Sequence, residues 1–267
     1  TYSLTDESFM QSGPISRIIT AMRFRANYGQ ATNFPTPFAN DRTFAANPFL
    51  GALTLTFGNP GDPNLGPEVV NSFEFGADMS FIDGRVGVSV TRYDNTTEDA
   101  LLTLPSAPSS GQLSQLRNVG EISNEGWEFE LDLAIIDKED IGLNIGGSLV
   151  TNQNELVDAG GAPPFVVGGF TFLGSWVEEG LPLGYLRGAN PEFDAEGNLV
   201  DVERNANLGD PNPNQYGAVN LNFRWKRFTL FSSADYQLGA QAVAVDDVLR
   251  YFGGVNDPTR IPQNAAN

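Results

Sequence analysis

The sequence contains no cysteine and no histidine among its 267 residues. It therefore has no disulfide, no thiol nucleophile, no Cys/His zinc site and no histidine-based catalytic triad. The lack of cysteine does not identify a compartment, because exported proteins need not contain disulfides. Cations are also scarce, since 15 lysines and arginines stand against 33 acidic residues and give a formal net charge of −18. This balance is opposite to that of most nucleic-acid-binding proteins, so we expect no nucleic-acid partner.

Long apolar runs are absent as well. No stretch of about 18 consecutive apolar residues occurs, which excludes a transmembrane helix within the sequence. A membrane-spanning β-barrel is compatible with this absence, because its strands are short and only half apolar. The chain begins with Thr1 rather than methionine and ends in the polar stretch "RIPQNAAN". Both ends resemble cut points, so we expect a portion of a longer protein.

The sequence does contain repeated alternation of apolar and polar residues. Large apolar side chains at every second position are typical of a β-strand, whose side chains point to opposite faces in turn. A break at Phe231 and Ser232 interrupts the last of the alternating segments. We predict seven strands, at residues 20–28, 69–81, 86–95, 121–136, 141–152, 217–225 and 228–238.

The connections between these strands alternate strictly between short and long. Tight turns are predicted at 82–85, 137–140 and 226–227, and long loops at 29–67, 96–120 and 153–216, with a tail after 239. The loops are rich in glycine, proline, asparagine and aspartate, and one helical turn is predicted at 3–9. Short turns at one end and long loops at the other are typical of outer-membrane barrels. Segments of ten or more residues also suit strands that cross a bilayer at a tilt.

Each predicted strand has one apolar and one polar face, and in a barrel these would meet lipid and the aqueous lumen. The residues predicted to face lipid are Phe73, Phe75, Met79, Phe81, Trp127, Phe129, Leu131, Phe223 and Trp225. The residues predicted to face the lumen, along a possible substrate path, are Arg23, Arg25, Asn27, Glu74, Asp78, Glu128, Glu130, Asp132 and Arg224.

Aromatic residues also gather in the long loops. They include Phe34, Phe38, Phe165, Phe170, Phe172, Trp176 and Tyr185. Local packing within the loops accounts for such a cluster. The alternative, which we weigh below local packing, is a ligand platform on the outer side, where rings stack on sugars or contact peptide side chains. We hold Phe34, Phe165, Phe170, Phe172 and Trp176 as candidate ligand contacts.

The acidic residues allow an enzymatic interpretation, which we consider the weaker one. Glu128, Glu130 and Asp132 could supply the carboxylate pair of a glycosidase, yet carboxylates spaced by two are ordinary on a solvated strand. The stretch "DAEGN" at 194–198 faintly resembles a calcium loop, but it lacks the ligands that follow in an EF-hand, so a turn is favoured. No nucleotide-binding motif is present. We therefore predict no catalytic residue, no metal and no cofactor.

Five stretches of the sequence match the wording of a known family. These are "AMRFRANYGQATNFPTPF" (21–38), "PNLGPEVVNSFEFGADMSFIDGRVGVSVTRYDNTTEDALL" (63–102), "LRNVGEISNEGWEFELD" (116–132), "VEEGLPLGYLRG" (177–188) and "LGDPNPNQYGAVNLNFRWKRFTLFSSADYQLGA" (208–240). In this order they resemble the C-terminal barrel region of SusC/RagA-like TonB-dependent outer-membrane receptors. The resemblance covers nearly the whole chain.

This resemblance implies a fold and a function. The fold class is all-β, an antiparallel transmembrane barrel segment with long extracellular loops. It would be part of a barrel of about 22 strands closed around an N-terminal plug. Residues 1–267 would be a partial barrel domain, without the plug and the remaining strands. The expected function is import across the bacterial outer membrane, driven by the TonB complex through the plug, with a SusD-like lipoprotein that captures oligosaccharide or peptide.

A second class of protein is also compatible with the alternation. In a secreted β-sandwich, such as an adhesin, the apolar faces of two sheets pack against each other. In a barrel the same residues form an exposed band about 25 Å tall. The surroundings of Phe73, Phe75 and Trp127 therefore distinguish the two classes.

Overall fold

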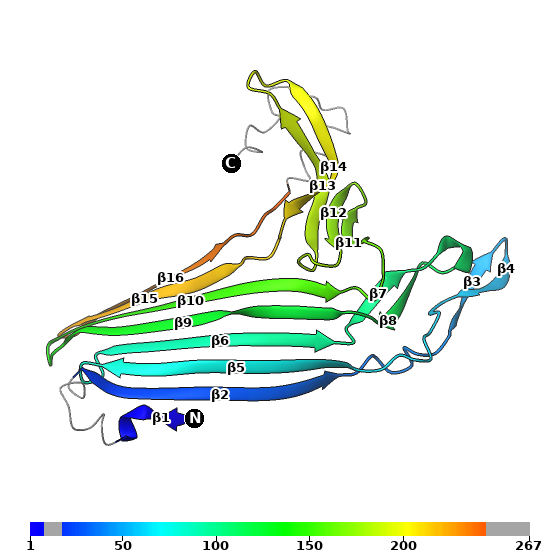
Figure 1. The fold of residues 1–267 in the computed structure, drawn as a ribbon. Helices are drawn as coiled ribbons and strands as arrows, with labels where there is room; N and C mark the ends of the chain where they lie inside the picture. The colour runs from blue at the N-terminus through cyan, green and yellow to red at the C-terminus, as the bar shows by residue number, and fades with distance from the viewer. Residues whose placement is uncertain (8–17, 244–267) are drawn as a thin grey trace.

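A computed structural model describes residues 1–7 and 18–243, and its centre is one antiparallel sheet of eight strands (Figure 1). In spatial order these are β1 (Tyr2–Ser3), β2 (Ile19–Asn33), β5 (Glu68–Phe81), β6 (Val86–Glu98), β9 (Glu121–Asp137), β10 (Ile141–Asp158), β15 (Gln215–Trp225) and β16 (Phe228–Leu238). The predicted all-β antiparallel fold is confirmed, and all seven predicted strands lie in this sheet. The eighth member, β1, pairs only Tyr2 and Ser3 with β2.

The tight turns all lie at one end of the sheet, on the left in Figure 1. Between β5 and β6, Ile82 and Asp83 both have φ of 54°, and Arg85 N–H donates to the Ile82 carbonyl at 3.1 Å. Positive φ at two successive turn residues matches the right-handed twist of the strands that a tight hairpin joins. Lys226 has φ of 53° in the two-residue turn between β15 and β16.

The long connections contain further strands that the alternation of residue types did not predict. The additional elements form two hairpins and a second sheet at the opposite end. They are β3 (Phe44–Phe49) with β4 (Ala52–Phe57), β7 (Leu101–Pro105) with β8 (Ser114–Asn118), and the sheet of β11 (Phe165–Phe170), β12 (Leu173–Val177), β13 (Tyr185–Phe193) and β14 (Leu199–Gly209). Most of these strands have five or six residues, too few for a clear alternation. The longer strands β13 and β14 are exposed on both faces over much of their length. Without a buried apolar face, their sequences show no alternation from which a strand could be predicted.

The predicted helical turn at 3–9 is only partly described. A short 3-10 helix, η1, covers Leu4–Asp6, and a second, η3, covers Pro108–Ser110 within the β7–β8 hairpin. Residues 8 and 9 lie outside the described part of the chain, as does the tail beyond 243. Across residues 1–7 and 18–243, no helix has the length and apolar character needed to cross a membrane.

The hydrophobic core lies at the loop end, where it includes the last residues of β10, and not over the faces of the central sheet. Leu104, Leu156, Ala159, Phe165 and Val177 are buried together there. Two hydrogen bonds tie the end of β10 to the segment after β12: Leu156 N–H donates to the Leu181 carbonyl at 3.0 Å, and Gly180 N–H to the Leu156 carbonyl at 2.8 Å. A soluble sandwich would instead bury its core against the face of the large sheet.

Strand pairing divides the central sheet into two faces. Side chains directly opposite each other in a ladder share a face, so the register carries each residue from strand to strand. All nine residues predicted to face lipid lie on one face, here called the apolar face. All nine residues predicted to face the lumen lie on the other, here called the polar face.

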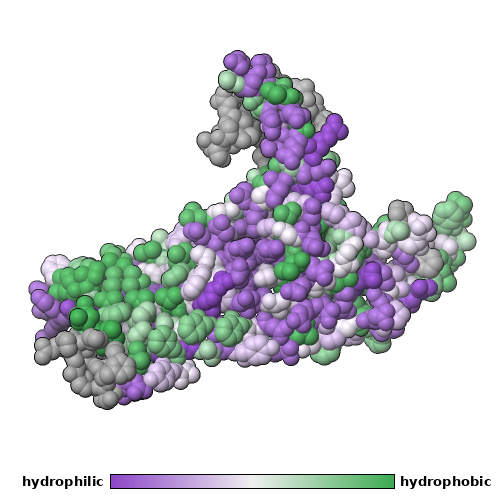
Figure 2. All heavy atoms as spheres, in the orientation of Figure 1, coloured by the Kyte–Doolittle hydropathy of each residue, from purple (hydrophilic) through white to green (hydrophobic). Residues whose placement is uncertain are grey.

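The apolar face is exposed. Phe73, Phe75, Trp127 and Leu131 keep 51%, 50%, 44% and 42% of their accessible surface, and no other described sheet is paired with or packed on them. Figure 2 shows hydrophobic residues gathered over the turn end of the sheet, with hydrophilic residues toward the loop end. Solvent-exposed aromatic residues in such numbers contradict a β-sandwich, in which this face would be the core.

Candidate functional site

Arg25 organises the centre of the polar face. Its guanidinium donates to the hydroxyls of Thr91 at 2.6 Å and Ser89 at 3.2 Å, and its Nε lies 3.6 Å from the Asp78 carboxylate. Arg25 starts on β2, opposite Gly76 of β5, and reaches β6. A Cβ at Gly76 would stand 3.1 Å from Arg25 Nε and 2.9 Å from the Val90 carbonyl oxygen. The absent side chain at position 76 therefore opens the path of the arginine.

Two glutamates extend this cluster onto β9. Glu128 lies opposite Thr91, and Glu130 lies opposite Ser89. Together with Arg25 and Asp78 they line a polar hollow of about 340 Å³. Within the described residues the hollow contains one arginine and three carboxylates, so its charge is net negative. It is suited to attract cationic groups.

The remaining polar-face residues lie outside the hollow. Asn27 donates to Glu74 at 3.4 Å nearer the loop end. Arg224 lies at the turn end, where it donates to the carbonyls of Lys138 and Glu139 at 3.1 and 2.9 Å. Arg224 therefore closes a turn between strands in this structure.

The carboxylates do not resemble the pair of a glycosidase. Glu128 and Glu130 come from one strand and point to the same side, whereas hydrolysis requires two carboxyl groups that flank the scissile bond. The "DAEGN" stretch forms the turn between β13 and β14. Asp194 Oδ1 accepts from the backbone N–H of Asn198 at 2.7 Å, and Oδ2 accepts from its side chain at 3.0 Å. These hydrogen bonds lower the pKa of Asp194, and they use its oxygens within the turn.

Replacement of Glu74 by alanine is expected to leave assembly intact. Its only recorded hydrogen bond within the described chain is the long one from Asn27, so its loss should change stability by no more than about 0.5 kcal/mol. The measurement is the fraction of full-length receptor that migrates as a folded, heat-modifiable band on a gel. Failure of this variant to assemble would show that the polar face is packed rather than solvated.

The loop end of the apolar face carries a feature that the sequence patterns did not single out. Arg92 forms an ion pair with Glu125 of the neighbouring strand, and its guanidinium lies 5.7 Å from the centre of the Trp127 ring. Both charged residues are on the same face as Val90 and Phe129. The sequence could have revealed this feature, because Arg92 is the first charged residue at the every-second-position spacing of Val86, Val88 and Val90.

This ion pair lies at the loop end of an apolar band, where Arg92 is opposite Phe75 and Glu125 is across β6 from Phe73. From Phe73 to Phe81 the band spans eight residue steps of β5, about 27 Å along the strand. At a tilt of about 40° this is roughly 20 Å along a membrane normal, and side chains at either end extend it toward the ~25 Å of an outer-membrane barrel. At the turn end, Trp225 and Phe228 stack with ring centres 6.3 Å apart.

The loop aromatics fall into two groups. Phe165 is buried in the loop-end core. Trp176 packs under Arg187, with 4.3 Å from guanidinium to ring centre. Tyr185 is buried and donates to Glu178, and burial together with this hydrogen bond raises the pKa of Tyr185 to about 12. For these three residues local packing explains the aromatic character.

The second group is exposed. Phe34 keeps 71% of its surface, and Phe170 stacks on Phe172 with ring centres 5.2 Å apart at the exposed end of β11. These rings have the accessibility that contact with a ligand requires, and that role stays a prediction. Among the residues that the structure describes, no three acidic side chains are arranged to hold a metal ion.

The profile of one protein family, described as "TonB dependent receptor-like, beta-barrel", matches residues 2–242. The chain belongs to this family. The predicted membership of the TonB-dependent receptors is thereby confirmed. Among relatives, TonB-dependent receptor P26 of Formosa agariphila is 31% identical over 165 residues, which cover 60% of this chain and 16% of the relative. TonB-dependent receptor P39 of the same organism is 27% identical over 230 residues, covering 76% and 21%.

The fold also matches solved structures. The RagAB peptide transporter superposes with a TM-score of 0.74 at 21% identity, covering 89% of this chain and 28% of that chain. The RagAB peptide importer in its "open-open" state gives a TM-score of 0.72. The chain thus spans only about a fifth of the length of its curated relatives and less than a third of these neighbours.

Proposed function

We propose that this chain forms part of the barrel wall of an active importer in the outer membrane of a Gram-negative bacterium. The observation that supports this most strongly is the division of the sheet: one face is apolar and exposed, and the other is polar. An open sheet edge in hydrocarbon leaves each unpaired backbone group unsatisfied at a cost of several kcal/mol. The eight strands therefore function with the further strands of a closed barrel.

The mechanism assigns each face a role. The nine apolar-face residues contact lipid, and the polar-face residues line the passage. The TonB complex acts through a plug outside this chain, and a SusD-like lipoprotein delivers oligosaccharide or peptide at the loop end. No bond is made or broken by these residues. Family membership supports transport in general, and the name of the RagAB peptide transporter favours peptide as one substrate class.

Uptake by intact cells tests this proposal. A strain lacking the full-length receptor is compared with the parent for uptake of fluorescently labelled oligosaccharides and peptides. We expect the receptor strain to accumulate one of these classes, and expect loss of accumulation when the proton gradient is collapsed. Deletion of the gene for the proposed SusD-like lipoprotein should lower uptake without removing the receptor. Accumulation of no class, or accumulation that does not depend on the gradient, would contradict active import.

A further inference from the structure

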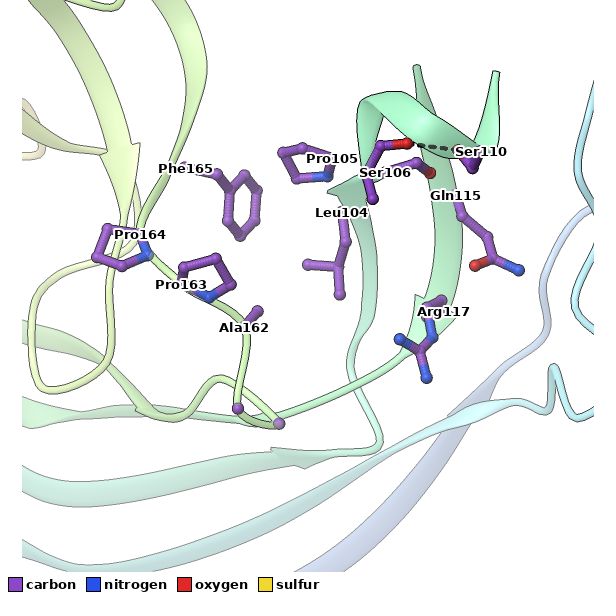
Figure 3. Close-up of a pocket in the computed structure, with 13 residues that line it drawn as sticks. Leu104, Pro105, Ser106, Ser110, Gln115, Arg117, Ala162, Pro163, Pro164 and Phe165 are labelled. Carbon is purple, nitrogen blue, oxygen red and sulfur yellow. Dashed lines mark hydrogen bonds between the residues drawn. The ribbon is translucent and has the colours of Figure 1, made fainter. Parts of the chain in front are cut away.

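A cavity of about 490 Å³ lies at the loop end, between the β7–β8 hairpin and residues 160–165. Figure 3 shows Pro163, Pro164 and Phe165 on one wall and the hairpin on the other. The volume falls within the ~300–1,000 Å³ of small-molecule sites in proteins. It is large enough for a monosaccharide or for one or two residues of a peptide.

The walls of this cavity are held in place without a ligand. Proline fixes φ at positions 105, 163 and 164. Leu104 and Phe165 belong to the buried core, and Ser106 N–H donates to the Leu113 carbonyl at 3.0 Å across the hairpin. A preformed site loses little conformational entropy when it binds, which favours affinity.

Arg117 is the one charged residue among those that line the cavity. Its Nε lies 3.7 Å from an oxygen of Asp62, which is too long for a hydrogen bond. Within the described residues, no acceptor is recorded for its two terminal nitrogens. The side chain of Asp62 is only 15% exposed and lies on the Nε side of the guanidinium. The two terminal nitrogens, here called the fork, are left open to a ligand. Such a fork matches the two oxygens of a carboxylate.

The chemistry of the site is thus a cationic fork beside an apolar wall, in a chain whose net charge is −18. We propose that this cavity binds a ligand carrying a carboxylate, with Arg117 as the anion-binding residue and Leu104, Pro105 and Phe165 as the wall for its apolar part. The inference rests on the proposed function, because it names the chemical class of cargo that the importer captures at its loop end. A peptide C-terminus and a uronic acid both offer this chemistry.

Binding to the purified full-length receptor tests the inference. The probes for calorimetry are the tripeptide alanyl-prolyl-phenylalanine, its C-terminal amide, trigalacturonate and neutral trigalactose. We expect at least one acid to bind about tenfold more tightly than its neutral counterpart, the difference that corresponds to one charge-assisted contact. Preference for the peptide acid identifies a peptide terminus as the source, and preference for the uronate identifies a sugar. Equal binding of both acid–neutral pairs, or no binding of any probe, would overturn the proposal.

Two pairs of variants tie the result to this cavity. Arg117→Gln should lower affinity for the acid about tenfold and leave the neutral probe unchanged. Arg204→Gln is its matched control, since Arg204 is an exposed arginine of β14 that does not line the cavity. Equal effects of the two variants would overturn the assignment to Arg117.

The second pair of variants is made at Gly161, where a substitution adds a side chain to the cavity and removes no existing contact. Gly161 lines the cavity with φ of +74°, and a Cβ there would meet nothing within 4 Å. Aspartate and asparagine both tolerate this backbone region. Gly161→Asp should weaken binding of the acid by repulsion, and Gly161→Asn should not. If the wild-type receptor imports cargo in cells but Gly161→Asp binds the acid as tightly as the wild type, only the assignment of the cavity is refuted. Acid-selective binding without gradient-driven uptake would instead contradict the importer.

Discussion

Replacing Leu131 by arginine is expected to destabilise the full-length receptor in a bilayer by about 2–4 kcal/mol. Leu131 lies near the middle of the apolar band on β9, between Val88 and Gly147, and keeps 42% of its surface. If that surface meets hydrocarbon, a guanidinium there must be dehydrated or must bend the side chain toward the interface. The measurement is the urea midpoint of folded receptor in phospholipid vesicles, together with its level in outer-membrane fractions.

Arginine at the adjacent position provides the control. Asp132 lies on the polar face, opposite Gly87 and Gly146, so Asp132→Arg places the same side chain one residue away in water. We expect its urea midpoint to stay close to that of the wild type. If both variants lose the same stability, or neither loses any, the apolar face does not contact lipid.

Replacing Gly126 by alanine is expected to cost about 3 kcal/mol, the upper part of the range for overpacking. Tyr93 of β6 crosses directly over Gly126 of β9, and its hydroxyl donates to Asn152 at 2.7 Å and lies 2.9 Å from the Thr151 carbonyl oxygen on β10. A Cβ at position 126 would overlap the Thr151 carbonyl oxygen of β10 and would stand 2.5 Å from the tyrosine hydroxyl. Both the ring and the backbone of β10 must therefore be displaced, and the hydrogen bonds of the tyrosine to that strand are lost.

Gly87→Ala is the matched control for this prediction. It lies on the same face, and a Cβ there would meet Asp132 at an ordinary 3.6 Å. We expect a change within about 0.5 kcal/mol, read from the same urea midpoint and from the folded band on a gel. A similar loss for both glycines would mean that the flexibility of glycine, rather than the close approach of Tyr93 and the Thr151 carbonyl, determines the effect.

The two faces of the sheet were predictable because successive side chains of a β-strand point to opposite faces whatever the strand packs against. The interruption at Phe231 and Ser232 illustrates this. The β15–β16 ladder runs without a register shift, with Phe231 opposite Asn222 on the polar face and Ser232 opposite Leu221 on the apolar face. The interruption is thus an exchange of residue types within an unbroken strand, and the residues after it keep their predicted faces.

Other features of the molecule depend on contacts that no local pattern encodes. The cavity next to Arg117 joins the hairpin at 104–117 with the segment at 160–165, which are separated by some forty residues of chain. Likewise, the sequence contains Arg25, Gly76 and Thr91, but only the register shows that the arginine passes the glycine to reach the threonine. Isolated glycines within alternating strands were the one available signal, since they often mark a close approach.

The Arg92–Glu125 pair has a consequence for the depth of the protein in the membrane. In the proposed orientation, sinking by a single residue step would carry these two charges toward hydrocarbon, and rising by one would draw the charged turn residue Lys226 toward hydrocarbon at the other end. If the apolar face contacts lipid as proposed, charges at both ends of the band therefore limit vertical displacement of the sheet in either direction. A band this short suits a bilayer thinner than average, so lipids with long acyl chains would have to compress around the receptor.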